Sequence, residues 1–440
     1  MTDMTKNVTE NPIAAKAEVG IDSLALYTPA FYIDLVELAR KRGVDPDKFT
    51  NGIGQDQQAV APSNQDIVTM GAAAALKALY FSGETEAAGF HDVGLLIVGT
   101  ESGVDASKAS ALFVHDLIGL TPWCRCLEIK EACFGGTAAL LTAYDYVKAH
   151  PDKKALVIAA DIARYGLDTP GEVTQGAGAM AMVVSRDPRL MVLEPHSTAY
   201  SASIGDFWRP VYTDMALARG KYSTEQYVDF FGKVWKRYGQ ETGRTLADFA
   251  ALCFHLPYTK MGMKAFKPVL DAWELLDEGS SGSLRKEPAD RLRDRYRLST
   301  VYSRRVGNIY SGSLYLGLLS LLDNDPSLQE GDRIGLFSYG SGAVGEFFSG
   351  ILRPGFRQVL HSDHTRAMLD KRFKLAIDSY ERVFQDAVPY GPEDFTTTRQ
   401  LLDKTNPFIL DRVEGQERIY QRLGGFSPLV IRRAVEHRDI

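Results

Sequence analysis

Continuous apolar runs constrain the fold of this 440-residue chain more than any other feature of its sequence. Residues 93–98 (Val-Gly-Leu-Leu-Ile-Val) and 155–160 (Ala-Leu-Val-Ile-Ala-Ala) have the length and composition of strands that are buried on both faces. Helical patterns over 65–80 and 107–117 alternate with such runs. Because this alternation occurs in both halves of the chain, we predict an α/β fold of mixed, mostly parallel sheets layered with helices.

Two glycine-containing segments indicate that the core is duplicated. They are 99–103 (Gly-Thr-Glu-Ser-Gly) and 339–342 (Tyr-Gly-Ser-Gly), and both follow predicted buried strands. Residues 279–298 are rich in Ser, Gly and Arg, which predicts an exposed connection. Residues 1–20 are mostly polar, and we expect them to form a disordered extension before the first strand, at 21–27.

The charge balance and the apolar segments exclude several classes of protein. Lys and Arg number 50 against 56 Asp and Glu, and no basic run is sustained, so neither nucleic acid nor an anionic membrane is expected as the main partner. The apolar stretch 314–322 is shorter than the roughly 20 residues that cross a bilayer. The first 18 residues resemble neither a signal peptide nor a transit peptide. We therefore expect a cytoplasmic protein.

The cysteines and histidines give no pattern of a metal site. Four cysteines in so long a chain do not make a disulfide framework, and Cys124-x-Cys126 lacks a second pair at zinc spacing. His361-x-x-His364 lies in a polar, charged stretch, where we predict a surface turn. We predict neither a metal nor a cofactor.

Cys133 is the first candidate for a catalytic residue. It lies in Glu-Ala-Cys-Phe-Gly-Gly-Thr (131–137), between a strand pattern at 125–129 and a helix pattern at 138–147. Amide groups at a helix start favour a thiolate and can hold a developing oxyanion, and the two glycines after the cysteine leave room for a substrate. Taken alone, the cysteine fits a buried structural residue better.

Three more polar residues follow predicted strands: Glu101, His255 and Ser341. Ligands in such sheets collect beyond the carboxyl ends of the strands, so these residues and Cys133 are expected to converge. Burial would raise the pKa of Glu101 toward that of a useful base, although a loop or helix-capping carboxylate fits the local sequence equally well. His255 has apolar neighbours and alone reads as a core histidine. A Cys/Glu/His site of this kind suggests thioester chemistry.

Longer motifs around these residues carry a family resemblance. They run in order from about residue 21 to 355 and resemble the 3-hydroxy-3-methylglutaryl-CoA synthase family, most closely its bacterial mevalonate-pathway members. The motifs are Gly-Thr-Glu-Ser-Gly-Val-Asp (99–105), Lys-Glu-Ala-Cys-Phe-Gly-Gly-Thr (130–137), Thr-Gln-Gly-Ala-Gly-Ala (174–179), Asp-Phe-Trp-Arg-Pro (206–210), Phe-His-Leu-Pro-Tyr-Thr-Lys-Met-Gly (254–262), Val-Gly-Asn-Ile-Tyr-Ser-Gly-Ser (306–313) and Phe-Ser-Tyr-Gly-Ser-Gly (337–342).

The resemblance implies a thiolase-like fold with two similar halves, 21–195 and 196–440, and a homodimer. It also implies an acyltransferase that condenses acetyl-CoA, acetoacetyl-CoA and water into 3-hydroxy-3-methylglutaryl-CoA (HMG-CoA) and CoA, in the mevalonate pathway of isoprenoid biosynthesis. In that scheme Cys133 is acetylated, Glu101 removes a proton from the acetyl methyl, and His255 positions the ketone of acetoacetyl-CoA and stabilises or protonates the alkoxide. These roles suit a strong sulfur nucleophile and a partly desolvated base.

Further residues take their roles from the same resemblance. Asn308 and Ser341 would line the acyl site, Thr174 and Ser223 would contact the ligand, and Asp161 and Asp206 would tune the site. Lys260 and Lys264 lie four residues apart on one face of a predicted helix that begins at residue 259, where both could meet CoA; each alone reads as a solvated surface charge. Phe134 stands where tyrosine is common in the family, which removes a hydroxyl near the site.

Three other functions remain open at this point. One is a related β-branching synthase that acts on polyketide intermediates bound to a carrier protein. A second is a catalytically silent acyl-CoA-binding protein on the same fold, which the presence of Glu101, Cys133 and His255 disfavours. A third, a ketoacyl synthase or thiolase, would require other partners, such as two histidines or a second cysteine.

Overall fold

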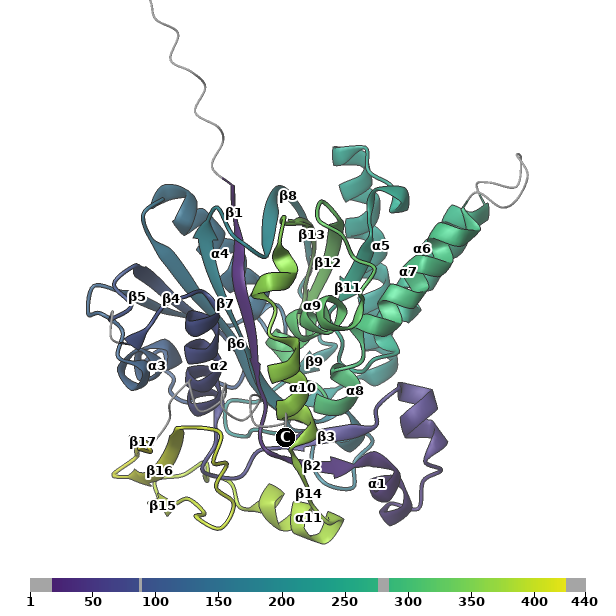
Figure 1. Ribbon diagram of the computed structural model, residues 1–440. Helices are drawn as coiled ribbons and strands as arrows, with labels where there is room; N and C mark the ends of the chain where they lie inside the picture. Colours follow the sequence, from purple (N-terminus) through teal and green to yellow (C-terminus); the bar gives the residue numbers. More distant parts are fainter. Residues whose placement is uncertain (1–17, 87–88, 276–284, 425–440) are drawn as a thin grey trace, which may run out of the picture.

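A mixed nine-stranded sheet runs through the molecule (Figure 1). The computed structural model describes residues 18–86, 89–275 and 285–424. The strand order is β11-β12-β13-β8-β1-β7-β6-β4-β5. In chain order these strands are β1 (Val19–Tyr27), β4 (Val93–Gly99), β5 (Arg125–Ile129), β6 (Lys154–Ala163), β7 (Gly176–Arg186), β8 (Met191–Ser201), β11 (Ala251–Phe254), β12 (Arg333–Gly340) and β13 (Val344–Leu352).

Antiparallel pairs outnumber parallel pairs in this sheet. Parallel pairing joins β5 to β4, β4 to β6 and β11 to β12, whereas the other five neighbouring pairs are antiparallel. The predicted mixed sheet is confirmed, but "mostly parallel" was wrong. The error has a physical cause, since an antiparallel strand that is covered on both faces, such as β7, also reads as a continuous apolar run.

The same strand topology occurs twice in the sheet. The order β4-β6-β7-β1 and the order β11-β12-β13-β8 have the same sequence of parallel, antiparallel and antiparallel pairs. In this repeat the end of β4 corresponds to the end of β11, so Glu101 corresponds to His255 rather than to residues 339–342. The expected boundary at residue 195 falls inside β8, and the division into two halves stays a prediction.

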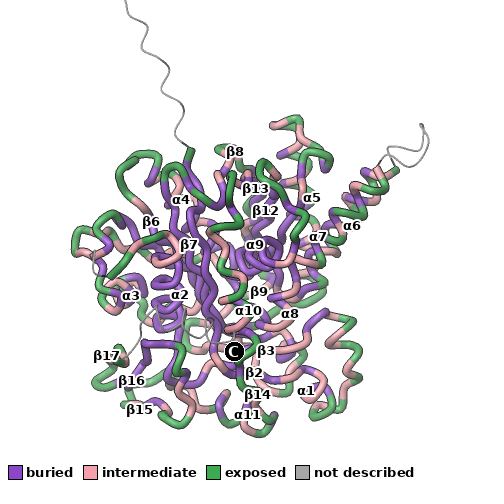
Figure 2. Tube along the Cα trace, viewed as in Figure 1, coloured by how far each residue is buried: buried purple, intermediate pink, exposed green. Residues whose placement is uncertain are grey.

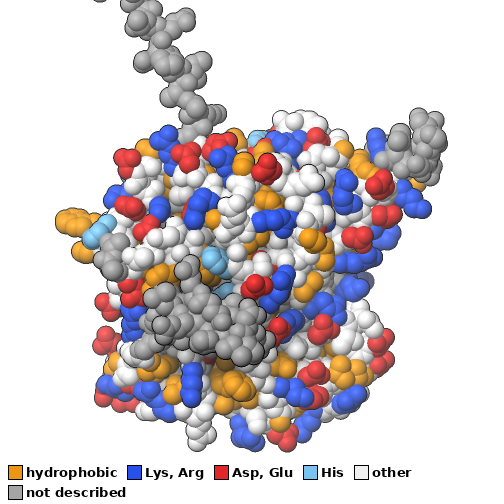
Figure 3. All heavy atoms as spheres, viewed as in Figure 1, with side chains coloured by type: hydrophobic (Ala, Val, Ile, Leu, Met, Phe, Trp, Pro, Cys, Tyr) orange, Lys and Arg blue, Asp and Glu red, His pale blue; other side chains and the backbone are white. Residues whose placement is uncertain are grey.

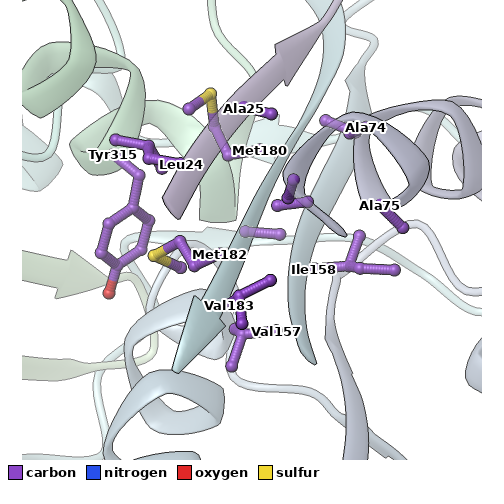
Figure 4. Close-up of a cluster of buried hydrophobic side chains, with 14 of the residues drawn as sticks. Leu24, Ala25, Ala74, Ala75, Val157, Ile158, Met180, Met182, Val183 and Tyr315 are labelled. Carbon is purple, nitrogen blue, oxygen red and sulfur yellow. The ribbon is translucent and has the colours of Figure 1, made fainter. Parts of the chain in front are cut away.

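Helices cover both faces of the sheet. The alanine-rich α2 (Ile67–Phe81) packs on β1, β7 and β6, and its small side chains allow close contact with the strands. Figure 4 shows Ala74 and Ala75 of α2 on one side of β7 and Tyr315, from α9 (Ser313–Asn324), on the other. α4 (Gly135–Ala149) packs on β4 and β6, and α5 (Gly220–Thr242) packs on β8 and β13. The expected layering of sheet and helices is therefore confirmed.

Most of the remaining elements lie around this core and are more exposed than its central strands (Figure 2). The helices are α1 (Leu35–Lys41), α3 (Ser110–Ile118), α6 (Met261–Leu275), α7 (Lys286–Ser299), α8 (Ser303–Val306), α10 (Ser362–Asp370) and α11 (Ile377–Gln385), with short helices η1 (Lys48–Ile53), η3 (Glu172–Thr174), η4 (Leu246–Asp248), η5 (Tyr310–Gly312) and η6 (Phe356–Val359). Three small sheets comprise β2 (Phe31–Asp34), β3 (Gln57–Val60) and β14 (Phe373–Lys374); β9 (Phe207–Trp208) and β10 (Leu217–Ala218); and β15 (Phe395–Thr396), β16 (Phe408–Glu414) and β17 (Glu417–Arg422).

Asp403 connects the C-terminal region to the core by hydrogen bonds. Its carboxylate accepts hydrogen bonds from the Tyr27 hydroxyl at 2.5 Å and from the Ala30 amide at 3.2 Å, at the end of β1. The Tyr420 hydroxyl reaches the N-cap carboxylate of α2, Asp66, at 2.6 Å. These contacts span more than 350 residues of sequence, so the tail completes the first half of the fold.

Three local predictions differ from the structure. Residues 286–298 of the predicted connection belong to α7, where Arg295 is buried and bound to Asp325 at 2.8 Å, while 279–284 lie outside the described residues. His361 is exposed, as expected, but it caps the start of α10 rather than lying in a turn, and its ring stacks on Phe81 with centroids 3.6 Å apart. Of the predicted extension, 1–17 lie outside the described residues, and 19–20 belong to β1.

The surface carries both signs of charge. On the face shown in Figure 3, basic and acidic side chains are interspersed rather than gathered by sign. Within the described ranges, no helix is long and apolar enough to cross a membrane.

Candidate active site

Cys133 lies in a tight turn between β5 and α4. Ala132, just before it, has a φ of +42°, a conformation that non-glycine residues seldom adopt and that clusters at functional sites. The Phe134 amide donates to the Glu131 carbonyl at 2.9 Å and closes the turn. The end of β12 passes close by, because a Cβ on Gly340 would lie 2.6 Å from the Cβ of Phe134. Glycine at 340 is therefore required where the end of β12 passes the turn of Cys133.

Glu101 contacts the cysteine directly. The Sγ of Cys133 donates to Oε1 of Glu101 at 3.3 Å, and both side chains are buried. Burial, with the nearby charge of Asp161, raises the pKa of Glu101 to about 8. Burial and the Glu101 carboxylate also raise the pKa of the Cys133 thiol well above its usual range. Amide groups at the helix start were expected to favour a thiolate, but burial and the Glu101 carboxylate outweigh that effect. The Cys133 thiol beside Glu101 is therefore protonated in the resting protein.

Asp161 organises the backbone around Glu101. Its fully buried carboxylate accepts from the Thr100 hydroxyl at 2.8 Å and from the Glu101 amide at 3.0 Å. It also accepts from the Ser311 amide at 3.1 Å and hydroxyl at 2.5 Å, in η5 of the second half. One carboxylate therefore joins the end of β4 to η5, which fits the tuning role expected for Asp161.

Aromatic side chains enclose the cysteine. Cys133 packs with Tyr310, Tyr165 and Phe207, whose rings meet edge to face with centroids 5.8–6.2 Å apart. Tyr310 has a φ of +40° and is fully buried, and its hydroxyl has no hydrogen-bond partner among the described residues. These rings exclude water from the pair, which is the physical reason for the raised pKa values of Glu101 and Cys133.

His255 follows β11, which forms the edge of the large sheet opposite β5. Its amide donates to the Phe337 carbonyl at 2.8 Å, and its carbonyl accepts from the Tyr227 hydroxyl at 2.7 Å. The imidazole is buried, its Nδ1 has no partner among the described residues, and burial lowers its pKa to about 3. A neutral imidazole donates a hydrogen bond to an oxygen more readily than it delivers a proton.

Asn308 and Ser341 lie at the start of η5 and after β12. Oδ1 of Asn308 accepts from the Tyr310 amide at 2.9 Å and from the Ser313 hydroxyl at 3.0 Å, while its buried Nδ2 is unpartnered within the described structure. Ser341 stands between Gly340 and Gly342. The Gly342 amide donates to Asp206 at 3.0 Å, so the turn that presents Ser341 is fixed by a buried carboxylate.

Ser223 and Thr174 make structural hydrogen bonds. The Ser223 hydroxyl donates to Asp206 at 3.1 Å, and this carboxylate also accepts from Tyr339 at 2.9 Å. The Thr174 hydroxyl donates to the Gly171 carbonyl at 2.8 Å. Ser223 is therefore connected, through Asp206, to the turn of Ser341.

Lys260 and Lys264 are exposed at the start of α6. The Lys260 amide donates to the Ile53 carbonyl of η1 at 3.2 Å, and the Lys264 ammonium donates to the Tyr258 hydroxyl at 2.8 Å. Both lysines follow His255 by a few residues. Neither contacts Cys133 or Glu101 in the described structure.

The structure therefore joins Glu101 directly to Cys133, and the common site predicted for the other residues stays a prediction. Across the described ranges, no group of three or more His, Cys, Asp or Glu side chains is arranged to hold a metal ion.

Comparison with known proteins identifies the family. The hydroxymethylglutaryl-coenzyme A synthase N-terminal family matches residues 15–188, and the corresponding C-terminal family matches residues 274–421. The hydroxymethylglutaryl-CoA synthase of Enterococcus faecalis is 48% identical over 371 residues, which cover 84% of this chain and 92% of that protein. The chain belongs to the hydroxymethylglutaryl-CoA synthase family. The predicted family and enzyme class are confirmed.

Solved structures of the hydroxymethylglutaryl-CoA synthase family have the same fold. An HMG-CoA synthase complexed with CoA is 39% identical and superposes with a TM-score of 0.85, covering 92% of this chain and 100% of that one. The Curacin biosynthetic pathway HMG synthase in complex with acetyl donor-ACP is 27% identical, with a TM-score of 0.83 and coverage of 92% and 100%. The predicted thiolase-like fold is therefore confirmed.

The family also includes a polyketide relative. The polyketide biosynthesis 3-hydroxy-3-methylglutaryl-ACP synthase of Bacillus subtilis (strain 168) is 29% identical over 417 residues, covering 91% of this chain and 96% of that protein. Identity to the Enterococcus faecalis synthase is much higher, which favours the CoA-dependent branch.

Sequence reasoning gave no role to two residues of this family site. Arg209, in the loop after β9, is buried with its Nη2 atom 4.0 Å from Oε2 of Glu101. Tyr310 packs against Cys133 and beneath the Arg209 guanidinium. Both belong to motifs that carried the resemblance, 206–210 and 306–313, but only the folded structure brings these segments together.

Proposed function

We propose that this chain condenses acetyl-CoA with acetoacetyl-CoA and water to give HMG-CoA and CoA, as the synthase of a mevalonate pathway. One observation carries the residue assignment: the nucleophile and the base are adjacent, with Cys133 Sγ 3.3 Å from Glu101 Oε1. Membership of the hydroxymethylglutaryl-CoA synthase family supports the reaction itself.

The first step forms an acetyl-enzyme. The sulfur of Cys133 attacks the acetyl carbonyl of acetyl-CoA, the C–S bond to CoA breaks, and the proton of the thiol ends on the departing CoA sulfur. Backbone amides near Cys133 and Ser341 are assigned to the oxyanion, other than those of Phe134 and Gly135, which donate to turn carbonyls. Because burial disfavours a free thiolate, loss of the proton and attack on the carbonyl are expected to be coupled.

Glu101 is the base of the second step. An acetyl group on Sγ would place its methyl two bonds beyond an atom that lies 3.3 Å from the carboxylate. Glu101 takes a methyl proton, and the enolate carbon then attacks the ketone carbon of acetoacetyl-CoA. A carboxylate with a raised pKa is a stronger base than an ordinary glutamate, which suits removal of a proton from carbon.

His255 and Asn308 supply hydrogen bonds for oxygen atoms of the substrates. Each has a buried nitrogen without a partner among the described residues, His255 Nδ1 and Asn308 Nδ2. We assign His255 to the ketone oxygen, which becomes the alkoxide, and Asn308 and Ser341 to the acyl site. Water then cleaves the thioester to Cys133, which frees the carboxylate of HMG-CoA and restores the thiol.

The CoA moiety is assigned to Thr174, Ser223, Lys260 and Lys264. The two exposed lysines at the start of α6 suit phosphate groups at the mouth of a tunnel, whereas carrier-bound pantetheine lacks the nucleotide phosphates. A structure of a 39% identical HMG-CoA synthase contains CoA, which supports CoA thioesters as substrates here. Carrier-bound substrates in place of CoA thioesters are the second candidate, because a 27% identical HMG synthase was solved with an acetyl donor-ACP.

The assembly and the location form part of the same proposal. β5 is an edge strand of the large sheet, and Leu127 on it and Trp123 just before it are 39% and 90% exposed. A free strand edge beside exposed apolar side chains suits pairing with a second copy, so we propose a homodimer. We also propose that the enzyme has two thiolase-like halves, 21–195 and 196–440, and works in the cytoplasm.

The acceptor assay tests this function. Purified enzyme with acetyl-CoA and acetoacetyl-CoA should deplete the absorbance of the acetoacetyl enolate and form HMG-CoA, and Cys133→Ala should not. Absence of HMG-CoA in the wild-type reaction would contradict the proposal. A strong preference for acetoacetyl carrier protein over acetoacetyl-CoA would transfer the assignment to the polyketide branch.

A further inference from the structure

Arg209 is a buried cation that the proposed chemistry leaves unused. Its side chain is 12% exposed, and its guanidinium lies 5.5 Å from the centre of the Tyr310 ring. Nη1 donates to the Ser102 hydroxyl at 3.4 Å, and the Tyr310 hydroxyl also acts on the guanidinium, but Nη2 and Nε make no hydrogen bond of good geometry among the described residues. Unpaired N–H groups on a buried charge are costly unless an opposite charge forms beside them.

That opposite charge can form on Glu101. The Nη2 atom of Arg209 is 4.0 Å from Oε2 of Glu101, while the other oxygen, Oε1, faces the sulfur of Cys133. The two oxygens of one carboxylate thus face different groups: one a cation and the other the nucleophile. The titratable groups that act on Glu101 or are acted on by it are Asp161 on β6, Cys133 and Glu131 in the turn before α4, Tyr165 after β6, Tyr310 in η5 and Arg209.

We propose that Arg209 is the positioning residue that keeps Glu101 ionised and turned toward Cys133 during the condensation step, an inference that rests on the proposed function. The ion pair of Nη2 with Oε2, at 4.0 Å, leaves Oε1 free to accept the methyl proton. When that proton arrives, the carboxyl becomes neutral, and Arg209 keeps its own proton throughout. Arg209 therefore acts through Glu101 and does not itself touch the reacting carbons.

The pH profile of the second step tests this role. Enzyme that has first been acetylated on Cys133 is mixed with acetoacetyl-CoA, and the single-turnover rate is measured across pH. Removing a nearby cation raises the pKa of a carboxyl, so Arg209→Met should move the midpoint of the rising limb upward by about 1 unit or more. Arg209→Lys keeps the charge, so its midpoint should stay near that of the wild type while its plateau rate falls, because lysine cannot reproduce the guanidinium geometry.

Arg219 provides a matched control. It follows β10, the strand that pairs with β9, and lies over the Trp208 ring, but its side chain is exposed. Arg219→Met makes the same change of charge and should leave the midpoint unchanged. If Arg209→Met lowers the rate equally at every pH, or alters nothing, Arg209 only packs the loop and the proposal is wrong.

Two further measurements distinguish failure of the role proposed for Arg209 from failure of the proposed function. Counting acetyl groups on Cys133 by mass tests the proposed function in the wild type alone. The pH dependence of Cys133 alkylation by iodoacetamide needs no CoA thioester, and its midpoint should rise in Arg209→Met, because the same cation favours the thiolate. An unchanged alkylation midpoint would overturn the electrostatic role. Should Arg209→Met fail to fold, full activity of Arg209→Lys at every pH would overturn the positioning role.

Discussion

At the residue scale, burial decides the chemistry of the site. Glu101 and Cys133 are enclosed by aromatic rings, and their contact at 3.3 Å lies in a region from which water is excluded. Burial is the largest cause of the raised pKa of both groups. Ionisation of the buried Glu101 carboxyl therefore costs the native state free energy that an exposed carboxyl would not cost.

The first prediction concerns the stability of Glu101→Gln. The pKa of Glu101 is raised from 4.5 to about 8, so between these values the native state holds a proton that the unfolded state has released. The wild type therefore loses stability as pH rises from about 4.5 to 8, and the glutamine variant does not. Its free energy of unfolding should exceed that of the wild type by about 2–5 kcal/mol at pH 9 and by little at pH 5.

Denaturant unfolding at the two pH values measures this difference. Glu330 is an exposed carboxylate, and Glu330→Gln serves as the control that should show little change at either pH. A Glu101→Gln variant that is less stable than the wild type at pH 9 would show that the carboxylate stabilises the fold.

The sequence predicted individual residues well where a motif marked them. Cys133 and Glu101 were identified from strand ends and motifs, and the structure brings them into contact. The roles of Arg209 and Tyr310 were missed, because a single sequence does not show that residues about 100 positions apart share one buried space. The high pKa of the Cys133 thiol was missed for the same reason: it depends on which side chains exclude water.

At the scale of elements, apolar runs predicted strands and helices better than they predicted strand direction. Most of the predicted strands of the sheet, and most of the predicted helices that pack on it, occur within a few residues of their expected bounds. Parallel and antiparallel strands covered on both faces have the same composition, so the direction of pairing was not readable. α7 was mistaken for a connection because its arginines look solvated, although Arg295 is buried against Asp325.

The second prediction belongs to helix α6. Lys260→Ala with Lys264→Ala should raise the apparent Michaelis constant for CoA thioesters and weaken its dependence on salt. The turnover number should change much less, because neither lysine contacts Cys133 or Glu101. Lys267→Ala is the matched control: this lysine is also exposed on α6 but pairs with Asp271 at 2.5 Å. An equal effect of the control would show that the charge of the helix matters rather than these two positions.

At the scale of the whole molecule, the repeated topology explains why the site forms where it does. The ends of β4 and β11 occupy equivalent positions in the two repeats and carry Glu101 and His255. The carboxylate of Asp161, on β6, accepts from the amide of Ser311, in η5, and so connects segments 150 residues apart. The motif order in the sequence indicated two halves, but it did not show which strand ends correspond. The fastening of the C-terminal region by Asp403 was also not foreseen, since it depends on contacts across the whole chain.

The third prediction concerns the proposed dimer. Leu127→Lys places a charge on the free edge of β5 and should shift the protein from dimer to monomer in sedimentation velocity. Leu275→Lys makes the same change at a more exposed leucine, at the end of α6, and should leave the dimer intact. A wild type that sediments as a monomer would contradict the homodimer directly.

The central claim is that Cys133 carries the acetyl group and Glu101 deprotonates it. Mass spectrometry after incubation with acetyl-CoA alone tests this claim, when it is followed by addition of acetoacetyl-CoA to the isolated acetyl-enzyme. We expect one acetyl group, on Cys133, in both the wild type and Glu101→Gln. Condensation in the variant should be slower by roughly 10²–10⁴-fold. Acetylation at Cys124, Cys126 or Cys253, or a Glu101→Gln acetyl-enzyme that condenses at the wild-type rate, would contradict it.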